Sequence, residues 1–231
     1  MQKQSINLTI LDAVSAMLLA AAIVIVFLFT PLEETMGAVQ KVFYMHVSAA
    51  WVGMLGFLAA AVCGAVYLKT RASRWDVMSE TGVEIGLVFT IVGIVSGSIW
   101  AKPVWNTWWT WDPRLTTSAV MVLVFLAYGM LRQGVDDPGR RARYSAVYAV
   151  AGFATVPLTF FSIRLFRTIH PVVVAGSSGI FAMDQAMLTA FFSCLAAFTV
   201  LFVDLFWHRY LLGRQTEELE VLQAVTEGES V

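Results

Sequence analysis

Charged side chains are scarce in this chain of 231 residues, and their scarcity excludes most soluble folds. Only 13% of the residues are charged, whereas 58% are hydrophobic and the mean hydropathy is +0.73. A soluble domain has about twice that share of charged residues. The composition therefore predicts an integral membrane protein.

Several functional classes lack their usual sequence signs. The net charge is -1, and no basic patch with interleaved aromatic residues occurs, so nucleic-acid binding is not indicated. No P-loop pattern is present, so any use of ATP would come from a partner. No internal repeat is evident, and an inverted-repeat transporter is therefore not supported. Cys63 and Cys194 both lie in apolar runs, where we expect them to act as small buried hydrophobic residues. They neither indicate nor exclude an oxidising compartment.

Six apolar runs are each long enough to cross the hydrocarbon layer, which takes about 20 residues. They cover residues 12–31, 46–68, 82–101, 115–132, 145–163 and 184–207. The sequence thus predicts an all-α integral membrane protein, a bundle of six transmembrane helices that forms one membrane domain over residues 1–231. The first run leads into Pro31 without a small-residue cleavage site, so we expect a retained helix. The spacings Gly82–Gly86 and Gly93–Gly97 predict close helix packing.

Lysine and arginine are concentrated in alternate connections. Ten of the 15 lie at the N-terminus or after the second, fourth and sixth runs: Lys3, Lys69, Arg71, Arg74, Arg132, Arg140, Arg141, Arg143, Arg209 and Arg214. The positive-inside rule predicts that these connections, both termini and the tail 208–231 are cytoplasmic. From Gln215 the tail is expected to form a short helix that frays into disorder. The other three connections are then outer loops.

The second outer loop, predicted over residues 102–114, is unusually rich in tryptophan. The stretch KPVWNTWWTWDPRLT contains Trp105, Trp108, Trp109 and Trp111. Composition alone favours an interfacial anchor, because indoles prefer the membrane surface. Pro103 and Pro113 bracket the cluster and predict an interruption of helix, which would leave a stiff strip of indoles able to stack on a planar ligand. Asp112 is expected to fix the loop, either by pairing with Arg114 or by accepting hydrogen bonds from backbone N–H groups.

Two of the three histidines share the outer side with the tryptophans. His46 and His170 lie at predicted outer helix ends, whereas His208 lies at the cytoplasmic end of the sixth run. A single loop histidine is more often a wet surface residue, and His208 is interpreted in that way. Two imidazoles beside an aromatic cluster are what a hexacoordinate haem iron requires. Zinc fits less well, since it would want four ligands and no cysteine or carboxylate cluster is near.

These stretches also carry a resemblance to a known family. WNTWWTWDPRLT resembles the tryptophan-rich WWD signature of haem-handling membrane proteins, and MHVSAAW and RTIHP supply one histidine on each side of it. A six-helix chain with these stretches after its first, third and fifth helices is similar to the CcmC family of bacterial cytochrome c maturation. The resemblance covers nearly the whole chain. One departure is Asn106, where the family usually has Gly, and a side chain there is expected to crowd the turn.

The resemblance implies a haem site at the periplasmic face of the bacterial inner membrane. His46 and His170 would be the axial ligands of a non-covalent b-type haem, and residues 105–112 would form its platform. The protein would not be an enzyme, because it would present haem to the haem chaperone CcmE, on which the covalent attachment occurs. Its other implied partners are the ATP-binding subunit CcmA, the membrane subunit CcmB and the small subunit CcmD.

Two arginines precede the second of these histidines. Arg164 and Arg167 lie six and three residues before His170, at the predicted outer end of the fifth helix. Arginine binds carboxylates bidentately and stays charged, so at least one of them is a candidate partner for the haem propionates. Contact with lipid headgroups explains either residue equally well.

Two other functional classes remain as alternatives. A membrane b-type cytochrome in electron transfer would usually have histidine pairs at bilayer depth, but none of the six runs has a histidine in its middle. A permease subunit would usually have ionisable residues at the midplane. The acidic residues of the runs instead fall near their ends: Asp12, Glu84, Asp184 and Asp204.

Overall fold

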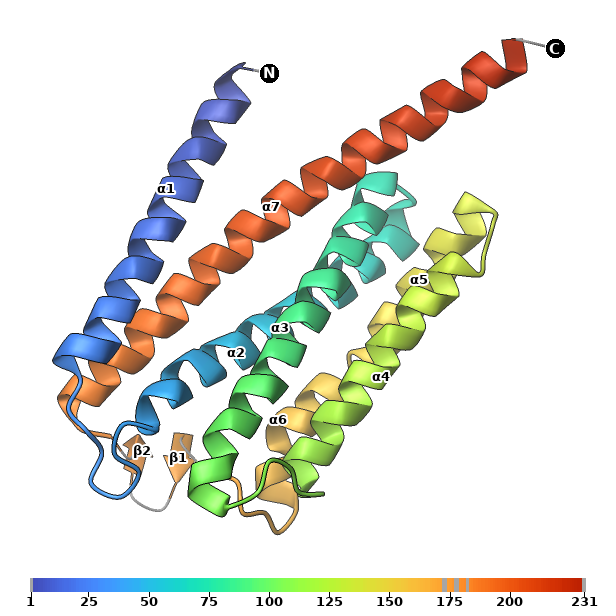
Figure 1. The fold of residues 1–231 in the computed structure, drawn as a ribbon. Helices are drawn as coiled ribbons and strands as arrows, with labels where there is room; N and C mark the ends of the chain where they lie inside the picture. Colours follow the sequence, from blue (N-terminus) through green and yellow to red (C-terminus); the bar gives the residue numbers. More distant parts are fainter. Residues whose placement is uncertain (1, 172–173, 177–178, 182, 230–231) are drawn as a thin grey trace.

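A computed structural model describes residues 2–171, 174–176, 179–181 and 183–229 (Figure 1). In this part of the chain, six helical spans are long and apolar enough to cross a membrane: Asn7–Phe29, Gln40–Thr70, Ser73–Trp105, Pro113–Gln133, Pro138–Leu165 and Gln185–Glu220. Each coincides with one predicted apolar run. The predicted fold of six membrane-spanning helical segments is therefore confirmed.

The spans are built from helices that differ in length and regularity. They are α1 (Gln2–Val24) with the π-helical turn η1 (Ile25–Phe29), α2 (Gln40–Thr70), α3 (Ser73–Trp105), α4 (Pro113–Gln133), α5 (Pro138–Gly152) with α6 (Thr155–Leu165), and α7 (Gln185–Glu229). Before α7, the three-residue strands β1 (Val174–Gly176) and β2 (Gly179–Phe181) form an antiparallel pair. In Figure 1 the start of α1 and the end of α7 lie at one end of the bundle, and the α3–α4 connection and the strands lie at the other.

The fifth span is interrupted, which its sequence run did not predict. The helix α5 ends at Gly152, and α6 begins at Thr155. Pro157 explains the interruption, because it has no N–H to donate and its ring clashes with the carbonyl of Phe153, four residues earlier. The chain bridges this point with tighter bonds, such as that from the Val156 N–H to the Phe153 carbonyl at 2.9 Å.

The helix α3 continues past Pro103, contrary to the expected interruption there. It ends after Trp105, and only residues 106–112 leave the helix before α4. A proline removes one backbone hydrogen bond from a helix. So close to the helix end, it leaves no further turns after it to disturb. The stop comes instead from Asn106, whose φ of 56° and ψ of 19° are left-handed.

The tail also differs from its expected form. Residues from Gln215 onward do not form a separate short helix, because α7 continues from the sixth span to Glu229 without a break. Glutamate, leucine and glutamine make up most of this stretch, and all three have high helix propensity.

Glycine lets the backbones of α2 and α3 touch at the centre of the bundle. A Cβ atom at Gly82 would lie 2.6 Å from the Gly56 carbonyl oxygen, and one at Gly56 would lie 2.7 Å from that of Gly82. The predicted close packing at Gly82 is thus confirmed. The rings of Phe57 and Phe125 stack with their centroids 3.7 Å apart and join α4 to this helix pair.

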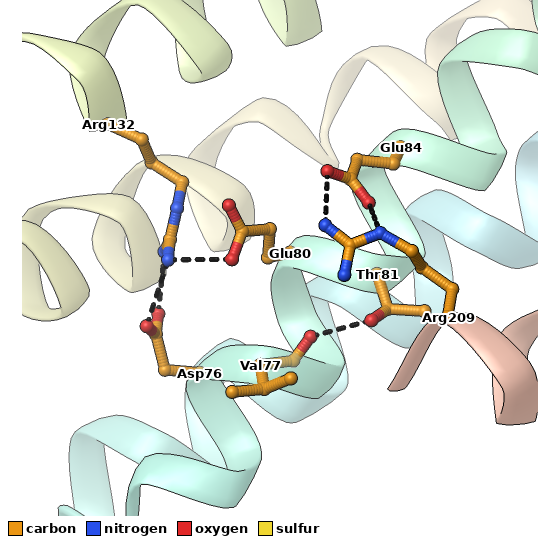
Figure 2. A network of polar contacts seen from close by, with 7 residues as sticks. All are labelled: Asp76, Val77, Glu80, Thr81, Glu84, Arg132 and Arg209. Atoms are coloured by element: carbon orange, nitrogen blue, oxygen red, sulfur yellow. Dashed lines mark hydrogen bonds and ion pairs between the residues drawn. The ribbon is translucent and has the colours of Figure 1, made fainter. Parts of the chain in front are cut away.

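Carboxylates of α3 pair with arginines of α4 and α7 towards the end that holds the termini (Figure 2). Arg132 donates to both Asp76 oxygens at 2.8 and 3.1 Å and to Glu80 at 2.9 Å. Arg209 contacts Glu84 at 2.6 and 2.8 Å. Each carboxylate therefore has a cation, which a low-dielectric environment requires.

Candidate functional site

A pocket lies at the end of the bundle opposite the termini, among α2, α3, α4, α6 and the segment after α6. It holds about 710 Å³ of empty space, its open mouth included. Its lining combines small, apolar and aromatic side chains with two histidines and an arginine: His46, Ala50, Met54, Thr90, Gly93, Ile94, Gly97, Ser98, Trp100, Ala101, Trp105, Trp109, Arg114, Leu115, Ser118, Met121, Thr159 and His170. No carboxylate or cysteine is among them.

The ring of His46 is held in one tautomer by α3. Its Nδ1 lies 2.8 Å from the Gly93 carbonyl oxygen, which can only accept, so Nδ1 carries the proton. The Ser96 hydroxyl lies 3.4 Å from the same nitrogen. Gly97 makes room for the ring, because a Cβ there would lie 2.7 Å from His46 Cε1. The lone pair of Nε2 is consequently available to a ligand.

His170 reaches the same pocket from the segment after α6. Its Nδ1 donates to the Pro171 carbonyl oxygen at 3.3 Å, which again leaves the Nε2 lone pair available. Its ring meets that of Trp105 at an angle of 65° with the centroids 6.2 Å apart. Burial, followed by the positive charge of Arg114, lowers the pKa of His170 to about 4. The imidazole is therefore neutral at physiological pH, as a metal ligand must be.

The structure divides the four predicted tryptophans into two pairs. Trp105 and Trp109 line the pocket, whereas Trp108 and Trp111 do not and are 57% and 79% exposed. Trp100 joins the first pair, with its ring centroid 5.2 Å from that of Trp105 in an edge-to-face contact. The indoles thus form both a pocket wall and a separate exposed surface.

Asp112 joins the tryptophan loop to the segment that carries His170. Its two oxygens lie 2.8 and 2.7 Å from the Thr168 hydroxyl, which donates to them. It also accepts from the backbone N–H groups of Ile169 at 2.9 Å and Arg114 at 3.0 Å, the latter capping α4. Burial alone would raise the pKa of Asp112, but these hydrogen bonds, with Thr168 the largest contributor, lower it below its usual 3.8. Thr168 Oγ1 accepts in turn from the His170 backbone N–H at 3.0 Å.

Of the two expected ways in which Asp112 fixes the loop, the contacts with backbone N–H groups are confirmed, and the ion pair with the Arg114 side chain is wrong. The guanidinium of Arg114 lines the pocket and donates from Nη1 to the carbonyl oxygens of Thr159 at 2.8 Å and Phe160 at 3.1 Å. The carboxylate of Asp112 is already occupied by hydroxyl and backbone donors, and Arg114 reaches it only through its own N–H. The loop is fixed, but by neutral donors.

The two arginines before His170 are exposed and do not line the pocket. Arg167 instead borders a groove on the outside, together with Trp111 and Pro113. Arg164 lies near the end of α6 and is not among the residues that line the pocket.

Several lining residues were missed because they lie inside apolar runs. Trp100 is the clearest, since its indole is buried and its Nε1 has no hydrogen-bond partner among the described residues. The hydroxyl of Thr159 is also buried and also has no hydrogen-bond partner among the described residues. A sequence signal for Trp100 existed: Gly93 and Gly97 precede it by seven and three residues and share its face of α3. That spacing was interpreted only as helix packing.

Comparison with known proteins identifies the family. Residues 2–222 match the CcmC family, described as Heme exporter protein C. This chain belongs to the CcmC family. It is 32% identical to Heme exporter protein C of Bradyrhizobium diazoefficiens over 197 residues, which are 84% of this chain and 75% of that protein. It is 30% identical to Heme exporter protein C of Escherichia coli K12 over 144 residues, which are 62% of this chain and 59% of that protein.

Membership of the CcmC family supports a coarse assignment of function. With its six apolar spans, the chain is a multi-pass membrane protein, and the family is consistent with haem handling for cytochrome c maturation. The family description indicates transport rather than catalysis.

Asn106, the departure from the usual CcmC pattern, now has a physical explanation. The position is left-handed, with φ of 56°, and glycine adopts that conformation without cost. Asparagine is among the few other residues that tolerate it. The expected crowding is wrong, because the Asn106 side chain is exposed, and Lys102 Nζ donates to the Asn106 carbonyl at 3.2 Å.

The connection through Asp112 leads to a first prediction. Asp112→Asn keeps the shape of the side chain but removes the charge and places an N–H₂ group against three donors. Each lost charge-assisted bond is worth about 1.5–3 kcal/mol, so amide exchange at Ile169 should accelerate roughly 10- to 100-fold. Hydrogen–deuterium exchange followed by mass spectrometry measures this directly.

The matched control for that experiment is Asp184→Asn. Asp184 also accepts a backbone N–H, that of Met187 at 2.8 Å, but before α7 and away from the pocket lining. It should leave exchange at Ile169 unchanged. Equal exchange at Ile169 in wild type and Asp112→Asn would contradict the role given to Asp112.

Proposed function

We propose that this protein binds a non-covalent b-type haem in the pocket and presents it to the haem chaperone CcmE. The observation that carries the proposal is that His46 and His170 line one pocket, each with Nδ1 bonded to a backbone carbonyl. Each Nε2 is then free to ligate iron, and haem iron takes two such axial nitrogens. Zinc would need further ligands, and no carboxylate or cysteine lines the pocket.

The rest of the lining suits a porphyrin. Trp105 and Trp109 offer flat apolar surface, and the guanidinium of Arg114 offers a cation to a propionate. Nη1 of Arg114 donates to two backbone carbonyls, and the remaining N–H groups of the guanidinium can bind a propionate. The exposed position of Arg164 and Arg167 outside the lining favours their headgroup alternative.

Haem would be handed on at the exposed side of the tryptophan loop. Trp108 and Trp111 turn large indoles outward beside the pocket, which suits a docking surface for CcmE. CcmA, CcmB and CcmD complete the proposed complex, and CcmA would supply ATP hydrolysis. The protein would lie in the bacterial inner membrane with both termini cytoplasmic and the pocket on the periplasmic side.

The alternative of an electron-transfer cytochrome gains no support of its own. His46 and His170 share one end of the bundle with the tryptophan loop, whereas transfer across a bilayer would need a second haem site near the other end. His208, towards that end, is bonded to Asp12 instead.

The ligand assignment is tested by absorption spectra of haem-loaded protein in detergent. His46→Ala and His170→Ala should each convert a six-coordinate low-spin spectrum to a high-spin one, because one axial nitrogen is lost. The double variant should lose most of its haem, and His208→Ala should match wild type. A low-spin spectrum that persists in the double variant would refute the assignment.

The division of the tryptophans is tested with two double variants. Trp105→Ala with Trp109→Ala removes pocket wall and should weaken haem retention about tenfold or more. Trp108→Ala with Trp111→Ala should retain haem and reduce transfer to CcmE. Haem titration and a transfer assay measure the two effects, and equal haem loss in both variants would contradict the division.

The proposed orientation is tested by cysteine labelling in intact cells. Cys63→Ala and Cys194→Ala first remove the native thiols, which are buried. Glu34 in the α1–α2 connection and Asp136 in the α4–α5 connection are both exposed, and their connections lie at opposite ends of the bundle. An impermeant maleimide should label Glu34→Cys, on the proposed periplasmic side, but not Asp136→Cys, on the proposed cytoplasmic side. The reverse pattern would place the termini outside.

A further inference from the structure

A second group of potential ligands lies far from the pocket, where α1 packs against α7. His208 Nε2 is 2.7 Å from Asp12 Oδ1 and 3.4 Å from Asp204 Oδ1. One ligand atom from each of the three side chains lies within 4.8 Å of the others. Asp204 and His208 are one helical turn apart on α7, so both face α1 from the same side.

Two buried oxygens at this place lack hydrogen bonds. Asp204 is 7% exposed, and its Oδ1 has no hydrogen-bond partner among the described residues. Ser15 is 2% exposed, and its hydroxyl faces Asp204 without reaching hydrogen-bond geometry with it or with another described group. Ser15 shares a face of α1 with Asp12, three residues earlier. A buried hydroxyl without a hydrogen bond, next to a carboxylate oxygen whose nearest partner is His208 Nε2 at 3.4 Å, is accounted for by an ion bound between them.

The charge of the group points the same way. Three carboxylates of α3 towards this end, Asp76, Glu80 and Glu84, are paired with arginine (Figure 2). Asp12 and Asp204 have one imidazole between them, and no lysine or arginine is paired with either in the described part of the chain. Protonated histidine would balance only one of the two negative charges, whereas a divalent ion would balance both.

We propose that Asp12, Asp204, His208 and Ser15 form a site for a divalent first-row transition metal ion, of which zinc is the type case. Imidazole and carboxylate together suit such ions, and imidazole disfavours magnesium and calcium. Tetrahedral ligands at 2.0–2.2 Å from the metal are about 3.3–3.6 Å apart. The Asp204–His208 distance of 3.4 Å already matches, and Asp12 Oδ1 must move away from its 2.7 Å contact with His208 Nε2 to reach the same spacing.

Binding requires that the Nε2 lone pair of His208 face the ion instead of an N–H facing Asp12. The proton that His208 now shares with Asp12 moves to Nδ1, which leaves a neutral imidazole with its Nε2 lone pair on the metal and releases no proton. The bound ion would join α1 to α7 at the end opposite the haem pocket, so this proposal does not rest on haem binding.

The test uses full-length, metal-free protein in detergent with cobalt(II) as a visible probe and zinc as its competitor. Wild type should bind a single cobalt ion with a nitrogen–oxygen ligand-field spectrum and release it to zinc. Asp204→Asn and His208→Gln should each weaken binding about tenfold or more, since loss even of outer-shell contacts costs that much.

Two controls separate this site from adventitious binding. Glu218→Gln removes an exposed carboxylate of the same helix and should bind cobalt like wild type. The His46→Ala, His170→Ala double variant should also bind like wild type, because its changes lie at the other end. Zinc should raise the unfolding temperature of wild type but not of Asp204→Asn.

Three results would overturn the proposal. They are cobalt binding by wild type no tighter than by Asp204→Asn, loss of binding only in the double variant at the pocket, and no thermal shift with zinc in wild type. In each case the group would be a hydrogen-bonded contact between two helices and nothing more.

Discussion

The close approach of α2 and α3 is the contact on which the pocket depends. Where Gly56 and Gly82 meet, either side chain would collide with backbone, so the two helices are fixed at a distance that few residues permit. Further along the same pair, Gly93 offers its carbonyl to His46, and Gly97 leaves space for the ring. A larger helix separation would leave the imidazole without its acceptor and free to change tautomer. Packing of this helix pair thus determines the tautomer of one proposed ligand.

The second proposed ligand depends on a polar contact instead. His170 lies outside the helices, and the carboxylate of Asp112 holds its segment through Thr168 and Ile169. The same carboxylate caps α4, so the tryptophan loop, the start of α4 and the His170 segment share one centre. Because hydrogen bonds outweigh burial and lower the pKa of Asp112, this centre stays charged at physiological pH.

Much of this arrangement was predictable from the sequence, and the remainder has identifiable causes. The lengths of the apolar runs predicted the six spans, and the distribution of lysine and arginine divided the connections into two groups. Both signals depend on composition over many residues. The contact between Asp112 and Thr168 was not predictable, since it joins residues 56 apart through one geometry. The interruption predicted at Pro103 was wrong because the effect of a proline depends on how near it lies to the helix end. Trp100 was hidden by the apolar run that contains it, although an indole in such a run has an N–H to satisfy.

The unequal support of the two histidines suits cargo better than a resident cofactor. His46 is part of a long helix and packs against glycine, so it moves only with the core. His170 is held by hydrogen bonds in a short segment, which can open without disturbing the helix pair. Under the proposed function, haem would keep its bond to His46 while the His170 side opens towards the exposed indoles of Trp108 and Trp111. A carrier must release what it binds, and a site with one rigid and one releasable ligand does this at lower cost than two rigid ones.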